Sequence, residues 1–162
     1  LEEAIRHIDA DCIQRFNDCF ESINGYFNRI FRQLFGGGKA GMKLEDPEDP
    51  LNTGIEIFAQ PPGKKLQNIR LLSGGERTLV ALSLLFAIFE YRPAAFCILD
   101  EADAALDEPN VDRFLRALHS FQGRTQFILI THNKRTMEIA DLLYGVTMQE
   151  SGVSQLVSVQ LH

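Results

Sequence analysis

The sequence predicts an α/β fold in which helices flank a parallel sheet. After Ser73 the apolar pattern alternates between the 3.6-residue period of helices and short, almost wholly apolar runs that are typical of parallel strands. A long amphipathic helix precedes this region, and a strand–turn–strand pattern follows it. At 162 residues, the chain has the length of about one domain.

Composition and charge exclude several classes of protein. With 45% hydrophobic and 23% charged residues, the chain is able to bury a core, which argues against disorder. The net charge of −6 makes the whole chain a poor binder of phosphate backbones, so any DNA contact would be local. Cys12, Cys19 and Cys97 show no metal-ligand spacing and are expected to lie in apolar surroundings as reduced structural thiols of a cytosolic protein. The apolar run 79–89 is expected to be too short and too interrupted to span a bilayer, and the first residues do not show the basic-then-apolar pattern expected of a leader.

The first predicted helix runs from Ile5 to Leu34. At 1.5 Å per residue it would extend about 45 Å, so either its first part projects as the root of a coiled coil or the whole helix packs on a core. Asn24-Gly25 favours a kink. The chain begins at Leu1 already inside this pattern, as an excised piece would. The apolar residues repeat seven apart in three columns: Ile5, Cys12, Cys19 and Tyr26; Phe16, Ile23 and Ile30; Ile13, Phe20, Phe27 and Leu34.

Turn residues divide the rest of the chain. Gly36-Gly37-Gly38 ends the long helix, and Pro61-Pro62-Gly63 precedes a basic loop whose default interpretation is a solvated segment. The loop contains Lys64, Lys65 and Arg70. The predicted strands and helices are strands 41–45 and 53–59, a helix 73–90, a strand 95–99, a helix 109–120, a strand 126–131, a short helix capped by Asn133, and a terminal hairpin of strands 144–148 and 153–161.

Polar residues follow two of the apolar strands, whose composition predicts that they are buried. Asp100-Glu101 comes after one strand and Thr131-His132 after the other. Ligands of open α/β sheets bind beyond the carboxyl ends of the strands, so both pairs are expected at a site. Adjacent carboxylates favour a hard cation such as Mg²⁺. The alternative is that Asp100 and Glu101 only cap the following turn, and His132 alone is more often structural.

The segment Ser73-Gly74-Gly75-Glu76 opens a helix as a capping box. Two glycines in a first turn are unfavourable for the helix, but they allow a group to approach the backbone N–H array, which binds anions such as phosphate. Glu76 would oppose an anion unless its carboxylate turns back to the cap or toward a ligand hydroxyl. The phosphate-cradling sequence G-x-x-x-x-G-K-[ST] is missing, so the residues describe an incomplete nucleotide site.

Four segments resemble motifs of ABC-type ATPases. Residues 72–77 resemble the signature, 96–101 the Walker B strand, Ala105-Leu106-Asp107 the D-loop, and 130–132 the switch histidine. Glu76, the long first helix and the closing segment 144–148 make the chain similar to the structural maintenance of chromosomes (SMC) family, most like its bacterial members.

The resemblance implies a C-terminal head lobe of ABC/P-loop type over residues 36–162, with residues 1–35 as a coiled-coil-proximal helix. It implies ATP and Mg²⁺ as cofactors. Asp100 would position Mg²⁺ through water, and the catalytic residues would be Glu101 for the attacking water, His132 for the γ-phosphate and Asp107 at the head–head interface. Ser73, Gly74, Gly75 and Glu76 would contact the γ-phosphate held by the opposing head. Asp107 is equally compatible with capping the helix at Pro109.

The same resemblance implies partners. These are the N-terminal half of the same head, a second head in a homodimer, the C-terminal winged-helix domain of a kleisin docking on the terminal hairpin, and DNA in the full complex. It implies an ATPase of chromosome condensation and segregation in the cytoplasm, associated with the nucleoid, of which this chain alone would be inactive. The alternatives are the head of a coiled-coil DNA-repair ATPase, or chiefly a kleisin-binding module.

Overall fold

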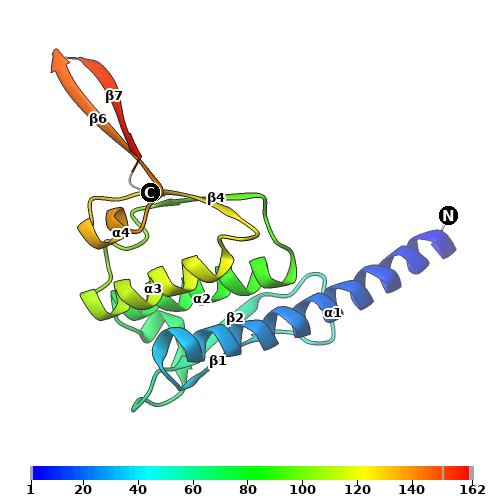
Figure 1. The fold of residues 1–162 in the computed structure, drawn as a ribbon. Coiled ribbons are helices and arrows are strands. Elements are labelled where there is room, and N and C mark those ends of the chain that lie inside the picture. Colours follow the sequence, from blue (N-terminus) through cyan, green and yellow to red (C-terminus); the bar gives the residue numbers. More distant parts are fainter. Residues whose placement is uncertain (1, 151, 161–162) are drawn as a thin grey trace.

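The computed structural model describes residues 2–150 and 152–160. Helices α2 (Gly74–Tyr91) and α3 (Glu108–Phe121) lie between a parallel strand pair and the long helix α1 (Glu2–Phe35), as Figure 1 shows. The strand pair consists of β4 (Phe96–Asp100) and β5 (Gln126–Ile130). The predicted α/β class, with its parallel strands, flanking helices, long first helix and terminal hairpin, is confirmed.

Helix α1 runs uninterrupted through Asn24-Gly25. Its last turns are buried at Phe27, Phe31 and Leu34, whereas its first turns extend away from the other elements (Figure 1) and expose Ile5. Asn24 serves the neighbouring strand, because its Oδ1 accepts from the Met42 N–H at 2.8 Å and its Nδ2 donates to the Met42 carbonyl at 3.3 Å. The second half of the helix therefore packs on the core and bonds to the neighbouring strand through Asn24, and its first half projects from the other elements.

A three-stranded antiparallel sheet follows α1, in the order β1 (Lys39–Leu44), β2 (Ile55–Gln60), β3 (Gln67–Asn68). Gly36, Gly37 and Gly38 all have positive φ and turn the chain from the helix into β1. Lys64, Lys65 and Arg70 are exposed, as the interpretation of a solvated loop predicts, and the second half of the loop forms β3 and a 3₁₀ turn, Ile69–Leu71. Asn68 caps this turn, because its Oδ1 accepts from the Arg70 N–H at 3.0 Å.

The core lies between α2, α3 and the end of α1. Phe86 of α2 packs in parallel against Phe121, with ring centroids 5.2 Å apart. The predicted inner face of α3 is confirmed by the burial of Val111, Phe114, Leu115 and Leu118. Each fully buried large apolar side chain contributes about 1.5–3 kcal/mol to stability.

The composition of β4 and β5 predicted burial on both faces, and this prediction is wrong for the chain alone. Cys97 and Leu129 pack on the core, but on the opposite face Phe96 is 62% exposed and Ile128 is 46% exposed. Helices cover one face of the β4–β5 pair, and no described residue of this chain covers the other face. Burial raises the pKa of the Cys97 thiol, whereas Cys12, expected in apolar surroundings, is exposed.

The chain ends in a short helix, α4 (Lys134–Glu138), and an antiparallel hairpin of β6 (Leu142–Glu150) and β7 (Val153–Gln160). The hairpin extends away from the helices (Figure 1) and exposes apolar side chains, with Val146 73% exposed opposite Leu156. Leu161, the last residue of the predicted strand, and Ser151 in the turn lie outside the described residues. Among the residues that are described, no helix combines the length and apolar character needed to cross a membrane.

Candidate functional site

The predicted acidic pair and the predicted histidine meet at the carboxyl ends of β4 and β5. Asp100 ends β4 opposite Ile130, and the Glu101 N–H extends the ladder by donating to the Ile130 carbonyl at 2.8 Å. His132 follows β5, and its Nδ1 lies 3.7 Å from Glu101 Oε1. Both side chains are largely exposed, so a ligand has access to them.

Glu101 has an unusual backbone. Its φ of +47° places it in the left-handed region, and among the described residues it is alone in this respect apart from glycines. Such a conformation is costly for a residue with a Cβ and is found mainly where function requires it. This left-handed residue directly follows β4, and its carboxylate lies beside His132.

A buried polar cluster beneath Glu101 and His132 joins the loops that follow β4 and β5. Asp103 is only 4% exposed, and its Oδ2 accepts from Thr131 Oγ1 at 2.7 Å and from Thr136 Oγ1. The Thr131 oxygen accepts in turn from the Asn133 N–H at 2.9 Å. The turn after Glu101, the residue before His132 and helix α4 are thus joined through one carboxylate.

The predicted capping box opens α2. Ser73 Oγ accepts from the Glu76 N–H at 3.4 Å, and Glu76 Oε2 accepts from the Ser73 N–H at 3.2 Å and from Ser73 Oγ at 2.9 Å. Lys64 Nζ lies 2.8 Å from Glu76 Oε1. This lysine contact, opposed by desolvation and helped by the Ser73 bonds, holds the pKa of the Glu76 carboxyl below its ordinary value. The carboxylate therefore turns back to the cap, which answers the question raised by the sequence.

The two glycines of this segment have different surroundings. A Cβ on Gly75 would lie 2.7 Å from the carbonyl oxygen of Ala105, so Gly75 lets the turn after β4 pack on the start of α2. A Cβ on Gly74 would meet nothing within 4 Å. Gly75 is explained by packing within the chain, and Gly74 leaves the backbone open to an outside group.

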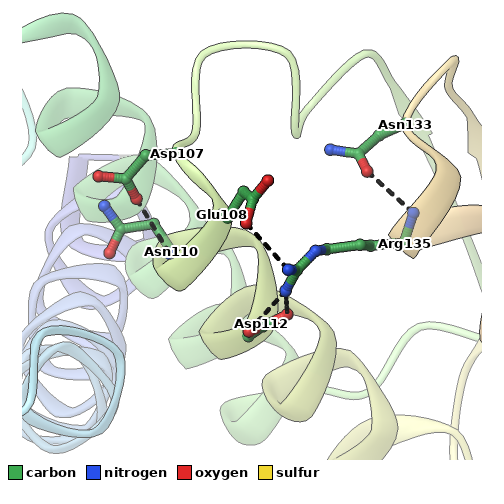
Figure 2. Close-up of polar contacts among 6 residues, drawn as sticks. All are labelled: Asp107, Glu108, Asn110, Asp112, Asn133 and Arg135. Atoms are coloured by element: carbon green, nitrogen blue, oxygen red, sulfur yellow. Dashed lines mark hydrogen bonds and ion pairs between the residues drawn. The ribbon is translucent and has the colours of Figure 1, made fainter.

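Asp107 caps α3, as the alternative interpretation expected, because its Oδ1 accepts from the Asn110 N–H at 3.0 Å. Figure 2 shows the neighbouring ion pairs, in which Arg135 of α4 donates to both oxygens of Asp112, at 2.8 and 2.9 Å, and to Glu108 at 2.9 Å. The contact with Asp112 raises the pKa of Arg135. These bonds tie the helix after His132 to the helix after Asp107.

Apart from Asp107, which caps α3, the predicted site residues form two groups. Asp100, Glu101 and His132 lie at the strand ends, and Ser73 to Glu76 lie at the start of α2. Gly75 contacts the turn after β4, but no described hydrogen bond or ion pair joins Ser73 or Glu76 to Glu101 or His132. The described residues include no group of three or more metal-binding side chains. A carboxylate such as that of Asp100 is a ligand type that Mg²⁺ prefers.

Sequence reasoning missed two contributors, Asp103 and Lys64. The spacing Asp100-Glu101-x-Asp103 was a signal for the first, since a third acidic residue near a strand end needs a partner. Lys64 was noticed only as part of a basic loop, and its partner lies 12 residues away across β3.

The chain is similar to known proteins over almost all of its length. A family model described as RecF/RecN/SMC N terminal domain matches residues 13–155. Chromosome partition protein Smc of Bacillus subtilis is 58% identical over 161 residues, which are 99% of this chain and 14% of that protein. The chain thus spans about one seventh of the length of this curated relative.

Solved structures match as well. The Smc head domain with an extended coiled coil from Pyrococcus furiosus, bound to the C-terminal domain of ScpA, superposes with a TM-score of 0.88 at 42% identity, covering 98% of this chain and 39% of that one. A chain from a study of ATP-driven dimerization and DNA-stimulated activation of SMC ATPases superposes with a TM-score of 0.82 at 40% identity, covering 91% of this chain and 89% of that one.

Proposed function

Because this chain belongs to the RecF/RecN/SMC family and has the fold of an SMC head, we propose that it forms the C-terminal half of the ATP-hydrolysing head of a chromosome-organising protein. The observation that carries the proposal is an incomplete site. Glu101 and His132 meet at the ends of two strands, and the 162 residues contain no phosphate-cradling loop.

The open face of β4 and β5 supports a missing half. Phe96 and Ile128 are apolar and exposed there, and an open groove of about 1160 Å³ lies between β5 and the hairpin. A strand pair of this composition is normally covered on both faces. We propose that the N-terminal half of the same head, carrying the phosphate loop, covers it. The matched family model is described by an N-terminal domain; our assignment to the C-terminal half rests instead on the motifs that this chain contains.

Within this head, residues 36–162 form the lobe and residues 1–35 lead into a coiled coil. The exposed first turns of α1 support the second assignment, because their apolar column is free to pair with another helix. The buried Phe27, Phe31 and Leu34 fix the base of that helix to the lobe.

The strand-end residues would handle the hydrolysis of ATP. Mg²⁺ bound with ATP supplies charge neutralisation for the phosphates. Asp100 would help to hold Mg²⁺, Glu101 would orient the attacking water and take its proton, and His132 would donate to the γ-phosphate. The turn at Glu101 and the Asp103 cluster support these roles, because they hold Glu101 and His132 side by side.

The signature residues would serve the nucleotide of an opposing head. Ser73 and Gly74 are exposed at the start of α2, where backbone N–H groups and the helix dipole favour a phosphate. Gly75 and Glu76 shape the segment, and Asp107 reaches the head–head interface while it caps α3. The functional unit is then a homodimer of heads.

The proposed partners also include a kleisin and DNA. The similar Pyrococcus furiosus head is bound to the C-terminal domain of ScpA, and the exposed apolar hairpin of this chain is our candidate surface for a kleisin winged-helix domain. If kleisin binding were the main role of this chain, the chain would be chiefly an interaction module. Altering Val146 and Leu156 in a pull-down with the kleisin separates that role from the ATPase. We propose a cytoplasmic, nucleoid-associated protein that acts in chromosome condensation and segregation.

The test uses the full-length protein and the Glu101→Gln variant. We expect the variant to bind ATP and accumulate as an ATP-dependent head dimer while turnover falls at least 100-fold. Turnover by Glu101→Gln at the wild-type rate would remove Glu101 from catalysis. The 162-residue chain alone should show no ATPase activity, and clear turnover by it would overturn the split-head proposal.

A further inference from the structure

Lys64 is held in place by its own turn. Its N–H donates to the Pro61 carbonyl at 3.0 Å, and its carbonyl accepts from Gln60 Nε2 at 2.9 Å. Gly63, with a φ of +77°, permits that turn. The side chain is about half exposed, and its Nζ lies 2.8 and 2.9 Å from the two oxygens of Glu76. The structure thus directs this lysine to the first turn of α2.

Ser73 has a single hydroxyl proton, which it donates to Glu76 Oε2. A phosphate that accepts a hydrogen bond from Ser73 must take this proton, because a phosphate oxygen is only an acceptor. Glu76 then keeps two of its present donors, the Ser73 N–H and Lys64 Nζ.

An uncompensated Glu76 would repel that phosphate. Its carboxylate lies 2.9 Å from Ser73 Oγ, the atom that would carry the new bond, and only 19% of its side chain is exposed, so water screens it weakly. Its pKa is lowered, chiefly by Lys64, so it is ionised at neutral pH. The charge of Lys64 cancels this charge next to the anion.

We propose that Lys64 is a positioning residue for nucleotide binding in trans: by neutralising Glu76 it allows the Ser73 end of α2 to accept a polyphosphate held by another head. This inference rests on the proposed function of the signature segment. Lys64 acts through Glu76 and makes no direct contact with the nucleotide.

The experiment measures ATP-dependent head association by analytical ultracentrifugation of the full-length protein carrying Glu101→Gln. Loss of the lysine charge should weaken nucleotide binding about fivefold at each site, which is the upper end of the effects expected for a half-exposed ion pair. Two sites per dimer then give about a 25-fold weaker association for Lys64→Met. Lys65→Met is the matched control, since Lys65 is exposed in the same loop and makes no ion pair among the described residues; it should change association less than twofold.

The double variant Lys64→Met/Glu76→Gln decides the mechanism. Removing both charges should restore association to within about threefold of the parent, and Lys64→Arg should stay in the same range because it keeps the charge. Unchanged association of Lys64→Met would overturn the inference, as would a double variant as weak as Lys64→Met alone. If the Glu101→Gln parent itself fails to associate on ATP, the proposed function is wrong and this inference falls with it.

Discussion

Replacement of Asp103 tests how firmly the loops that follow β4 and β5 are joined. The Asp103 carboxylate is 4% exposed and accepts from the hydroxyls of Thr131 and Thr136. A hydrogen bond to a charged group contributes about 1.5–3 kcal/mol. Asp103→Ala removes two such bonds, but the Thr131 loop is able to relax toward water, so we expect a loss of about 3–4 kcal/mol. Asp103→Asn keeps a carbonyl acceptor and should lose roughly 1 kcal/mol.

Urea unfolding of the assembled head, followed by circular dichroism, measures these losses. Asp11→Ala is the matched control, because Asp11 is exposed and its ion pair with Arg15 lies within α1. It should stay within about 0.5 kcal/mol of the parent. An Asp103→Ala head as stable as the control would refute the reasoning, and equal losses for Ala and Asn would show that the two hydroxyl bonds are not what Asp103 contributes.

Two further substitutions test the contacts around the site. Gly75→Ala should destabilise the head by about 1–3 kcal/mol, because its Cβ would meet the Ala105 carbonyl oxygen, whereas Gly74→Ala should unfold at nearly the parent temperature; equal melting temperatures in differential scanning fluorimetry would contradict this. Arg135→Ala should lower the melting temperature slightly and by less at 1 M than at 0.05 M NaCl, since its exposed ion pairs are screened. A salt-independent loss would mean that Arg135 acts through packing.

Local features of the fold could be predicted from the sequence, because their causes lie within a few residues. The Ser73 cap, the Asp107 cap and the inner face of α3 follow from spacing along one helix. The position of Glu101 and His132 at the carboxyl ends of β4 and β5 could be predicted for a similar reason, since polar residues directly follow each apolar run in the sequence.

Contacts between residues that are far apart in the sequence could not be predicted from the sequence pattern. Gly75 faces Ala105, and Asp103 finds its hydroxyl donors 28 and 33 residues away. No spacing rule relates such distant positions. The predicted burial of β4 and β5 was wrong for a different reason: their apolar residues match an environment that the described residues of this chain do not complete.

The open face of β4 and β5 couples folding to association. If another segment covers Phe96, Ile128 and their neighbours, its binding free energy adds to the stability of this lobe by mass action, in proportion to RT ln(1 + [segment]/Kd). A substitution in that segment would then lower the melting temperature of a lobe that it never alters covalently. In that case the stability of this chain would depend on the concentration of the covering segment as well as on its own residues.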